Sequence, residues 1–252
     1  MNYKSNSIKI QICSDIHLEE DNNLQFHDVI TPVADYLILA GDICHPGTRN
    51  YELFLQQCSL HFQQVFIING NHEYYSDDDT MQIIDNKVKL ICENLKNVTF
   101  LDKSEVEVGN YVIIGCTLWS FIPAKYYNDA VTHMNDFKYI QGMTVHNYNK
   151  LHQLQSKWLQ DKIHSAQNQG KKLIVITHHP PSMNGTSLLR YSNDPLRFCY
   201  KNNMDHLISM PCIAAWICGH THFSFCTKRG KTLFLSNQYR SKIYKSNFTI
   251  EV

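Results

Sequence analysis

Residues 8–17 read IKIQICSDIH, and this stretch shows the pattern on which the fold prediction rests. A short apolar run ends directly in a polar group that contains Asp15 and His17. Continuous runs rich in Ile, Val and Leu are typical of strands that are buried on both faces of a sheet. The runs of this kind are Ile8 to Cys13, Tyr36 to Ala40, Val65 to Ile68, Tyr111 to Ile114, Leu173 to Ile176 and Ile213 to Cys218.

Segments with helical spacing separate some of these strands. Apolar residues fall at steps of three and four between Met81 and Leu95, and again between Leu151 and Ile163. Such alternation of strands and helices predicts an α/β architecture. No linker, repeat or low-complexity tract interrupts the chain, so we expect a single domain over residues 1–252.

The remaining segments are less regular. Residues 98–112 are expected to form a strand pair that turns at Gly109-Asn110, and residues 224–235 a hairpin. The segments 119–149 and 182–203 lack clear periodicity, and we interpret them as long ordered loops.

The composition excludes several classes of protein. The 252 residues include 23 basic and 23 acidic side chains, and 43% are hydrophobic, which excludes a disordered chain. No apolar run is long enough to span a bilayer or to form a signal peptide at the start. The nine scattered cysteines are expected to be reduced and mostly buried thiols. We therefore expect a cytoplasmic protein with no membrane contact and, without a basic excess, no strong nucleic-acid signal.

Five of the strand ends carry side chains that can bind a metal ion. The carboxyl ends of strands are where open α/β sheets bind ligands, so these side chains are expected to meet. Carboxylate, carboxamide and imidazole groups without a thiolate suit Mn, Fe, Zn or Co. Seven such ligands are too many for one tetrahedral ion, but they suit two ions that share a carboxylate. The candidate ligands are Asp15, His17, Asp42, Asn71, His178, His220 and His222.

The local spacing also suggests how these side chains are directed. Asp15 and His17 are two residues apart, and extended backbone would point both side chains the same way. The same holds for the pair His220 and His222. Each of Asp42, Asn71 and His220 follows a glycine, which permits a sharp turn and a close approach to a ligand.

In order and spacing, these five blocks resemble the calcineurin-like metallophosphoesterase superfamily, and in finer detail a little-characterised bacterial-type branch. The resemblance spans nearly the whole chain and implies two packed mixed β-sheets flanked by helices, a four-layer sandwich. It further implies two divalent ions, manganese first, with Fe, Zn or Co as alternatives. The ligands that it implies are Asp15, His17 and His222 for one ion, Asn71, His178 and His220 for the other, and Asp42 as the bridge.

The activity implied by this resemblance is two-metal-dependent hydrolysis of a phosphomonoester or phosphodiester, with a hydroxide that bridges the ions as the nucleophile. His72 matches the general acid of the family, and Glu73 is expected to orient it. Protein Ser/Thr phosphatases have an Asp-Arg pair after the second block. Here Ile43 and Cys44 follow Asp42, so a small phosphate ester is the expected substrate.

Two alternatives stay open from the sequence. One is a scaffold or binding protein that keeps the fold and has lost catalysis, although such a protein has no need of His72. The other is a nuclease or a cyclic nucleotide phosphodiesterase, for which no basic stripe is present. The sequence defines neither the substrate nor the oligomeric state. It also leaves open the roles of His179, Asn135, Asp136 and three candidate phosphate contacts, Arg190, Arg197 and Arg240.

Overall fold

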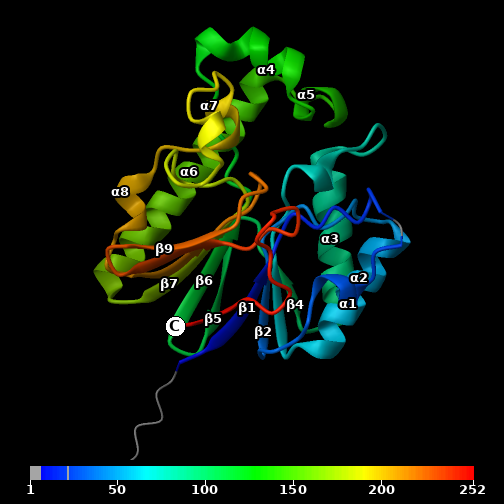
Figure 1. Ribbon diagram of the computed structural model, residues 1–252, viewed down its shortest axis with the longest axis vertical. Helices are drawn as coiled ribbons and strands as arrows, with labels where there is room; N and C mark the ends of the chain where they lie inside the picture. Colours follow the sequence, from blue (N-terminus) through cyan, green and yellow to red (C-terminus); the bar gives the residue numbers. More distant parts are fainter. Residues whose placement is uncertain (1–6, 22) are drawn as a thin grey trace, which may run out of the picture.

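Two mixed β-sheets packed face to face form the centre of the computed structural model, which describes residues 7–21 and 23–252 (Figure 1). Residues 1–6, which belong to the segment where we expect no signal peptide, lie outside the described residues. The first sheet has the order β11 (Thr249–Glu251), β1 (Lys9–Cys13), β2 (Tyr36–Leu39), β3 (Gln64–Ile67) and β4 (Val98–Phe100). The second has the order β5 (Ser104–Val108), β6 (Tyr111–Cys116), β7 (Lys172–Thr177), β8 (Ile213–Ile217), β10 (Thr232–Ser236) and β9 (Phe225–Arg229).

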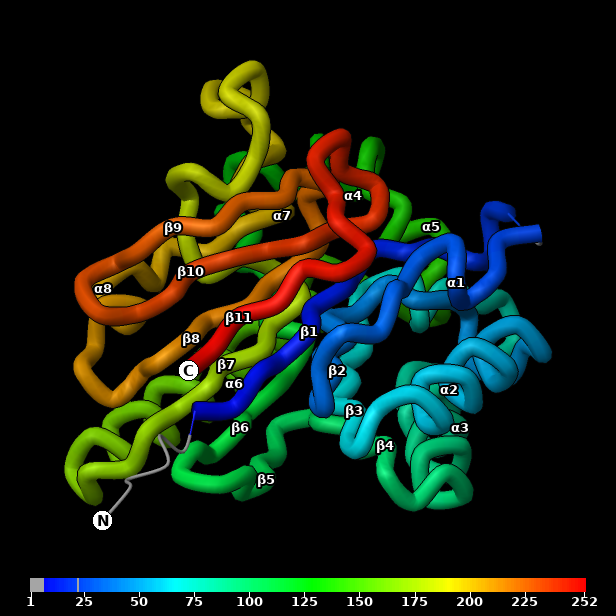
Figure 2. Tube along the Cα trace, turned by 60° about the horizontal axis from the view of Figure 1, so that its bottom comes forward, coloured from blue at the N-terminus to red at the C-terminus, as the bar shows by residue number. Residues whose placement is uncertain are grey.

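Parallel pairing dominates both sheets, and antiparallel strands lie only at their edges. In the first sheet β11 runs antiparallel to β1, which places the C-terminal strand beside the first strand of the chain (Figure 2). In the second sheet β5 and β9 are the antiparallel edge strands. The central strands therefore point the same way, and their carboxyl ends meet at one edge of each sheet.

Helices cover the outer faces of both sheets and complete the four layers in a single domain, as predicted (Figure 1). The side chains of β2 show how both faces are buried. Leu37 and Leu39 pack outwards against the helices, whereas Ile38 packs into the core between the sheets. The first sheet is covered by α1 (Phe26–Val29), α2 (Arg49–His61) and α3 (Met81–Leu95), and the second by α6 (Val145–Gln169) and α8 (Asp205–Ile208). None of the helices described, including the 25-residue α6, has the length and hydropathy of a bilayer-spanning segment.

Threonine caps define where the long helices begin. The side chain of Thr80 accepts a hydrogen bond from the backbone of Ile83 at the start of α3, and Thr144 caps α6 in the same way. Helix α2 is not predicted from the sequence. Its outer face carries the exposed Leu53 and Leu60, which obscure the apolar stripe that the helix buries.

The irregular segments differ in part from the predictions. The turn at Gly109-Asn110 joins β5 to β6 as expected. The prediction that this strand pair begins at residue 98 is wrong, because β4 pairs with β3 in the other sheet. The hairpin over residues 224–235 is confirmed as β9 and β10. The segments 119–149 and 182–203 form a cap above the strand ends, packed around the buried Trp119 and Tyr148 (Figure 1). The cap contains η2 (Ala124–Tyr126), α4 (Tyr127–His133), α5 (Asp136–Tyr139), η3 (Leu189–Tyr191) and α7 (Arg197–Tyr200).

Candidate metal centre

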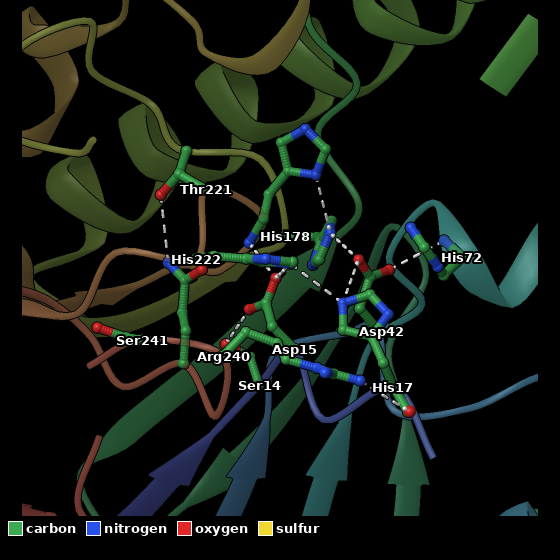
Figure 3. A network of polar contacts seen from close by, with 12 residues as sticks. Ser14, Asp15, His17, Asp42, His72, His178, Thr221, His222, Arg240 and Ser241 are labelled. Carbon is green, nitrogen blue, oxygen red and sulfur yellow. Dashed lines mark hydrogen bonds and ion pairs between the residues drawn. The ribbon is translucent and has the colours of Figure 1, made fainter. Parts of the chain in front are cut away.

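The structure brings all seven candidate ligands together at the carboxyl ends of strands from both sheets. Figure 3 labels Asp15, His17, Asp42, His178 and His222 among them. The first sheet contributes its ligands just after β1, β2 and β3. The second sheet contributes its ligands just after β7 and β8. In this order the residues are Asp15 and His17, Asp42, Asn71, His178, and His220 with His222.

One group consists of Asp15, His17 and His222, whose ligand atoms all lie within 4.8 Å of one another. The Nε2 atoms of His17 and His222 are 3.2 Å apart. On its other side, His17 places Nδ1 3.1 Å from Oε1 of Glu19. Because Nδ1 donates to this carboxylate, Nε2 of the neutral His17 ring presents a lone pair to the group.

A second group, in which ligand atoms of Asp42, His178 and His220 lie within 4.8 Å of one another, adjoins the first. Oδ1 of Asn71 is 3.1 Å from Nε2 of His178 and 3.1 Å from Nδ1 of His220. Oδ2 of Asp42 is 3.2 Å from Nε2 of His178 and 3.6 Å from Nε2 of His17. Asp42 therefore reaches both groups, as a bridging ligand would.

The chemistry of these contacts fits a cation. Nδ1 of His178 donates to the carbonyl of Ala40 at 2.9 Å, so its Nε2 lone pair faces the oxygens of Asn71 and Asp42. Acceptors that face acceptors repel one another unless a proton or a cation lies between them. Burial lowers the pKa of His178, but Asp42 outweighs burial and raises that pKa to about 10. A divalent ion can replace the proton and satisfy every one of these lone pairs.

The backbone at these positions is not extended, so the extended-chain explanation for the paired side chains is wrong. Asp15, His17 and Asp42 each have a φ of 54°, and His220 and His222 have values of 75° and 51°. These angles lie in the left-handed region, which costs a residue other than glycine roughly 1–3 kcal/mol and is concentrated at functional sites. The strained turns, rather than the pleat of a strand, direct the side chains toward one another.

The glycines beside the ligands allow the close approach that the sequence predicts. A methyl group on Gly41 would lie 2.6 Å from the backbone nitrogen of Gly70. A methyl group on Gly219 would lie 2.6 Å from Oδ2 of Asp15. Since atoms in ordinary contact are at least 3.4 Å apart, a side chain at either position would displace a neighbour.

His72 lies beside the ligands and lines the pocket above them. It begins the short helix η1 (His72–Tyr74), so its direction is set by a helical turn and not by extended chain. Its backbone N–H donates to Oδ1 of Asp42 at 2.9 Å, and its Nδ1 is 3.2 Å from Oε1 of Glu19. Burial lowers the pKa of His72, but Asp42 and Glu19 outweigh burial and raise it to about 9. In the metal-free protein His72 therefore carries a proton at neutral pH.

The two glutamates near the site have distinct positions. Glu73 is fully buried and accepts hydrogen bonds from the backbone N–H groups of Asp42, Ile43 and Gly70 at 2.7–3.0 Å. These bonds connect the two loops that carry Asp42 and Asn71, and they come from backbone groups and not from the His72 ring. Glu19, which the sequence interpretation missed, instead accepts from both His17 and His72. The one feature of the sequence that could have indicated a role for Glu19 is its position two residues after His17.

The arginines and His179 occupy separate places. Arg240 lies nearest the ligands, where it donates to the carbonyl of His17 at 3.4 Å and pairs with Glu20 at 2.7 Å. Arg190 and Arg197 belong to the second loop and lie over the rings of their own neighbours, Tyr191 and Phe198. His179 is buried, with Nδ1 2.7 Å from Oγ of Ser120 and its ring stacked on His220 at 3.9 Å. His179 thus supports a candidate ligand from behind.

A pocket opens from the candidate centre toward the cap. Part of its wall consists of the ligands themselves. The cap adds Asn135 and Tyr200, and the buried Asp136 lies beside Asn71 at its edge. Among the described residues, no lysine or arginine lines this pocket. Its lining is Asp42, Asn71, His72, Tyr75, His133, Met134, Asn135, Asp136, Tyr200, His220 and His222.

Comparison with known proteins agrees with this geometry. A family model described as calcineurin-like phosphoesterase matches residues 8–224. An uncharacterized protein of Acanthamoeba polyphaga mimivirus, L509, is 27% identical over 268 residues, which cover 95% of this chain and 93% of that protein. Among solved structures, the phosphopantetheinyl hydrolase of Mycobacterium tuberculosis superposes with a TM-score of 0.74 at 16% identity, covering 98% of this chain and 96% of the other. At this identity the similarity to the solved structure establishes the shared fold.

Proposed function

The chain belongs to the calcineurin-like phosphoesterase family, and we propose that it is a two-metal-dependent hydrolase of a small phosphate ester. Asp15, His17 and His222 would hold one divalent ion. Asn71, His178 and His220 would hold the other, with Asp42 shared between the two. Manganese is the first candidate metal, and Fe, Zn or Co suit the same oxygen and nitrogen ligands.

One observation carries this proposal: carboxylate, carboxamide and imidazole groups from two sheets converge where a proton or a metal ion must lie between them. The Nε2 atom of His178 lies 3.1 Å from Oδ1 of Asn71 and 3.2 Å from Oδ2 of Asp42. A structural zinc site would use cysteine, whereas this ligand set is typical of catalytic centres that activate water. Together with His72 beside it, this ligand set supports an enzyme over a scaffold that keeps the fold and has lost catalysis.

The protein groups around the centre support the following division of work. When bound, a pair of divalent ions supplies a water-derived nucleophile at neutral pH and neutralises charge on the phosphoryl oxygens. His72 carries a proton and lines the pocket, so it is placed to protonate the oxygen of the leaving group. Glu19 holds the Nδ1 side of the His72 ring, and Glu73 acts on the loops that carry Asp42 and Asn71.

A small substrate fits the surroundings better than a nucleic acid. The pocket is lined by carboxylate, carboxamide, tyrosine, histidine and methionine side chains, and its described lining contains no lysine or arginine. A nuclease would need cations to follow a phosphate backbone. All nine cysteines are free thiols and only Cys226 is exposed, which agrees with the proposed cytoplasmic location.

A substrate screen tests the proposal. The purified protein is loaded with Mn²⁺ and assayed with p-nitrophenyl phosphate, bis-p-nitrophenyl phosphate, cyclic nucleotides and a single-stranded oligonucleotide. We expect turnover of at least one small ester, its loss in Asp42→Asn, and wild-type rates in the control His164→Ala, an exposed position on α6. Binding of two ions without turnover of any substrate would favour the scaffold alternative, and turnover confined to the oligonucleotide would favour the nuclease.

A further inference from the structure

We propose that Asp136 is a positioning residue that fixes the orientation of the Asn71 carboxamide, so that its oxygen faces the candidate metal centre. The inference rests on the proposed function only in treating Asn71 as a metal ligand. Asp136 lies 65 residues from Asn71 in the sequence, at the start of α5 in the cap. No motif of the strand ends includes it.

Three polar groups form a closed triangle behind Asn71. Nδ2 of Asn71 donates to Oδ1 of Asp136 at 2.8 Å and to the hydroxyl oxygen of Tyr75 at 2.9 Å. The Tyr75 hydroxyl in turn donates to the same Oδ1 of Asp136 at 2.7 Å. Asp136 is 2% exposed, so water does not compete for these bonds.

The triangle permits one orientation of the Asn71 amide. The single proton of the Tyr75 hydroxyl is directed to Oδ1 of Asp136, so this oxygen acts as an acceptor. Both groups therefore require a donor from Asn71. A flipped amide would place Oδ1 of Asn71 about 2.8 Å from a carboxylate oxygen, where two acceptors repel each other. It would also turn the amide nitrogen Nδ2 toward the imidazole nitrogens of the centre. An amide NH₂ group only donates hydrogen bonds and offers no lone pair to a metal ion.

A helix-capping role does not explain the position of Asp136. The N-cap residue of α5 is Asn135, and its side chain makes no capping hydrogen bond. The Asp136 carboxylate is directed away from its own helix, to Asn71 and Tyr75. Its neighbour Met134 is packed in the buried cluster of the cap. The cap that forms the wall of the pocket thus also holds one of the candidate metal ligands.

Metal titration of variants tests this role without relying on activity. Apoprotein prepared with a chelator is titrated with Mn²⁺, and bound ions are counted by elemental analysis. In Asp136→Ala we expect one ion to bind as in the wild type and the other about 10–100-fold more weakly, as is usual when a partner of a metal ligand is lost. Asp136→Asn keeps an acceptor oxygen, so its affinities should stay within about threefold of the wild type, under 1 kcal/mol.

Matched variants separate orientation from folding and from charge. Asp136→Leu removes the acceptor but fills the space. If urea unfolding shows that Asp136→Ala lowers the stability of the apoprotein, the metal affinities of Asp136→Leu are used as the test instead. Asp161→Ala, an exposed position on α6, should bind both ions normally. If Asp136→Asn loses as much affinity as Asp136→Ala, charge and not orientation is the cause, and the proposal is wrong. Two ions bound with wild-type affinity in Asp136→Leu would also overturn it.

The two proposals can fail separately. A wild-type protein that binds two ions, loses one in Asp136→Ala and hydrolyses no ester would support the positioning role and refute the hydrolase. A wild-type protein that hydrolyses esters, together with an Asp136→Leu variant that keeps both ions, would support the hydrolase and refute the positioning role. A wild-type protein that binds no Mn²⁺ at all would refute both.

Discussion

Replacing Gly70 with alanine tests how closely the candidate metal centre is packed. A methyl group at this position would lie 2.2 Å from Oδ1 of Asp42 and 2.7 Å from Cε1 of His178. The φ of Gly70 is outside the left-handed region, so its backbone accepts alanine without strain. Any loss in Gly70→Ala must therefore arise from these contacts.

The size of the loss follows from the space that is missing. Because ordinary contact begins at 3.4 Å, the Asp42 carboxylate must retreat by roughly 1 Å. A shift of the Asp42 carboxylate by this distance breaks either the hydrogen bond from the His72 backbone N–H to Oδ1 or the contact between Oδ2 and His178. A displacement of this size typically costs about 10²-fold in rate, and overpacking costs about 1–3 kcal/mol in the free energy of unfolding.

Metal content, kcat/KM on an active ester and urea unfolding are measured together for this variant. Gly142→Ala is the control, since Gly142 has no atom within 4 Å of the added methyl and its φ is +70°. The control should lose about 1 kcal/mol of stability through backbone strain while it keeps its metals and its rate. Gly70→Ala protein with both ions and an unchanged kcat/KM would refute the idea that Asp42 must occupy this position.

Three further predictions concern the acid, the metals and a half-buried carboxyl outside the site. His72→Asn should keep both ions and lose about 10²–10⁴-fold in kcat on an alkyl phosphate, but much less on p-nitrophenyl phosphate, whose leaving group hardly needs a proton; equal losses on both esters would exclude the acid role. Chelation should abolish hydrolysis and Mn²⁺ should restore it at least partly, so turnover that survives exhaustive chelation would contradict a metal-dependent mechanism. Burial raises the pKa of Asp85 from 3.8 to about 6, although Tyr74 donates to it. The unfolded chain therefore loses this proton first, and the contribution of Asp85 to stability falls as the pH rises from about 4 to about 6. Asp85→Asn should be more stable than the wild type by about 1–2 kcal/mol at pH 7.5, after allowance for partial exposure, and equal to it near pH 4 in urea unfolding.

The strands and their polar ends could be predicted because both are local properties of the chain. The runs before Asp15, Asp42 and His178 are rich in Ile, Leu and Val, and beyond their first residues the structure buries them on both faces. The parallel order of those strands then brings the residues after them to one edge. Helix α2 was missed for an equally local reason, because Leu53 and Leu60 place apolar side chains on its exposed face.

The sequence by itself determined which residues line the candidate centre, and the tertiary structure decided how they are held there. Extended backbone was the natural expectation at Asp15 and His17, but packing imposes left-handed turns that no local pattern signals. The partners of the site were equally hidden from the sequence. Glu19 meets His72 across 53 residues and Asp136 meets Asn71 across 65. A hydrogen bond between side chains depends on distance in space, and distance along the chain does not report it until the sheets and the cap have packed.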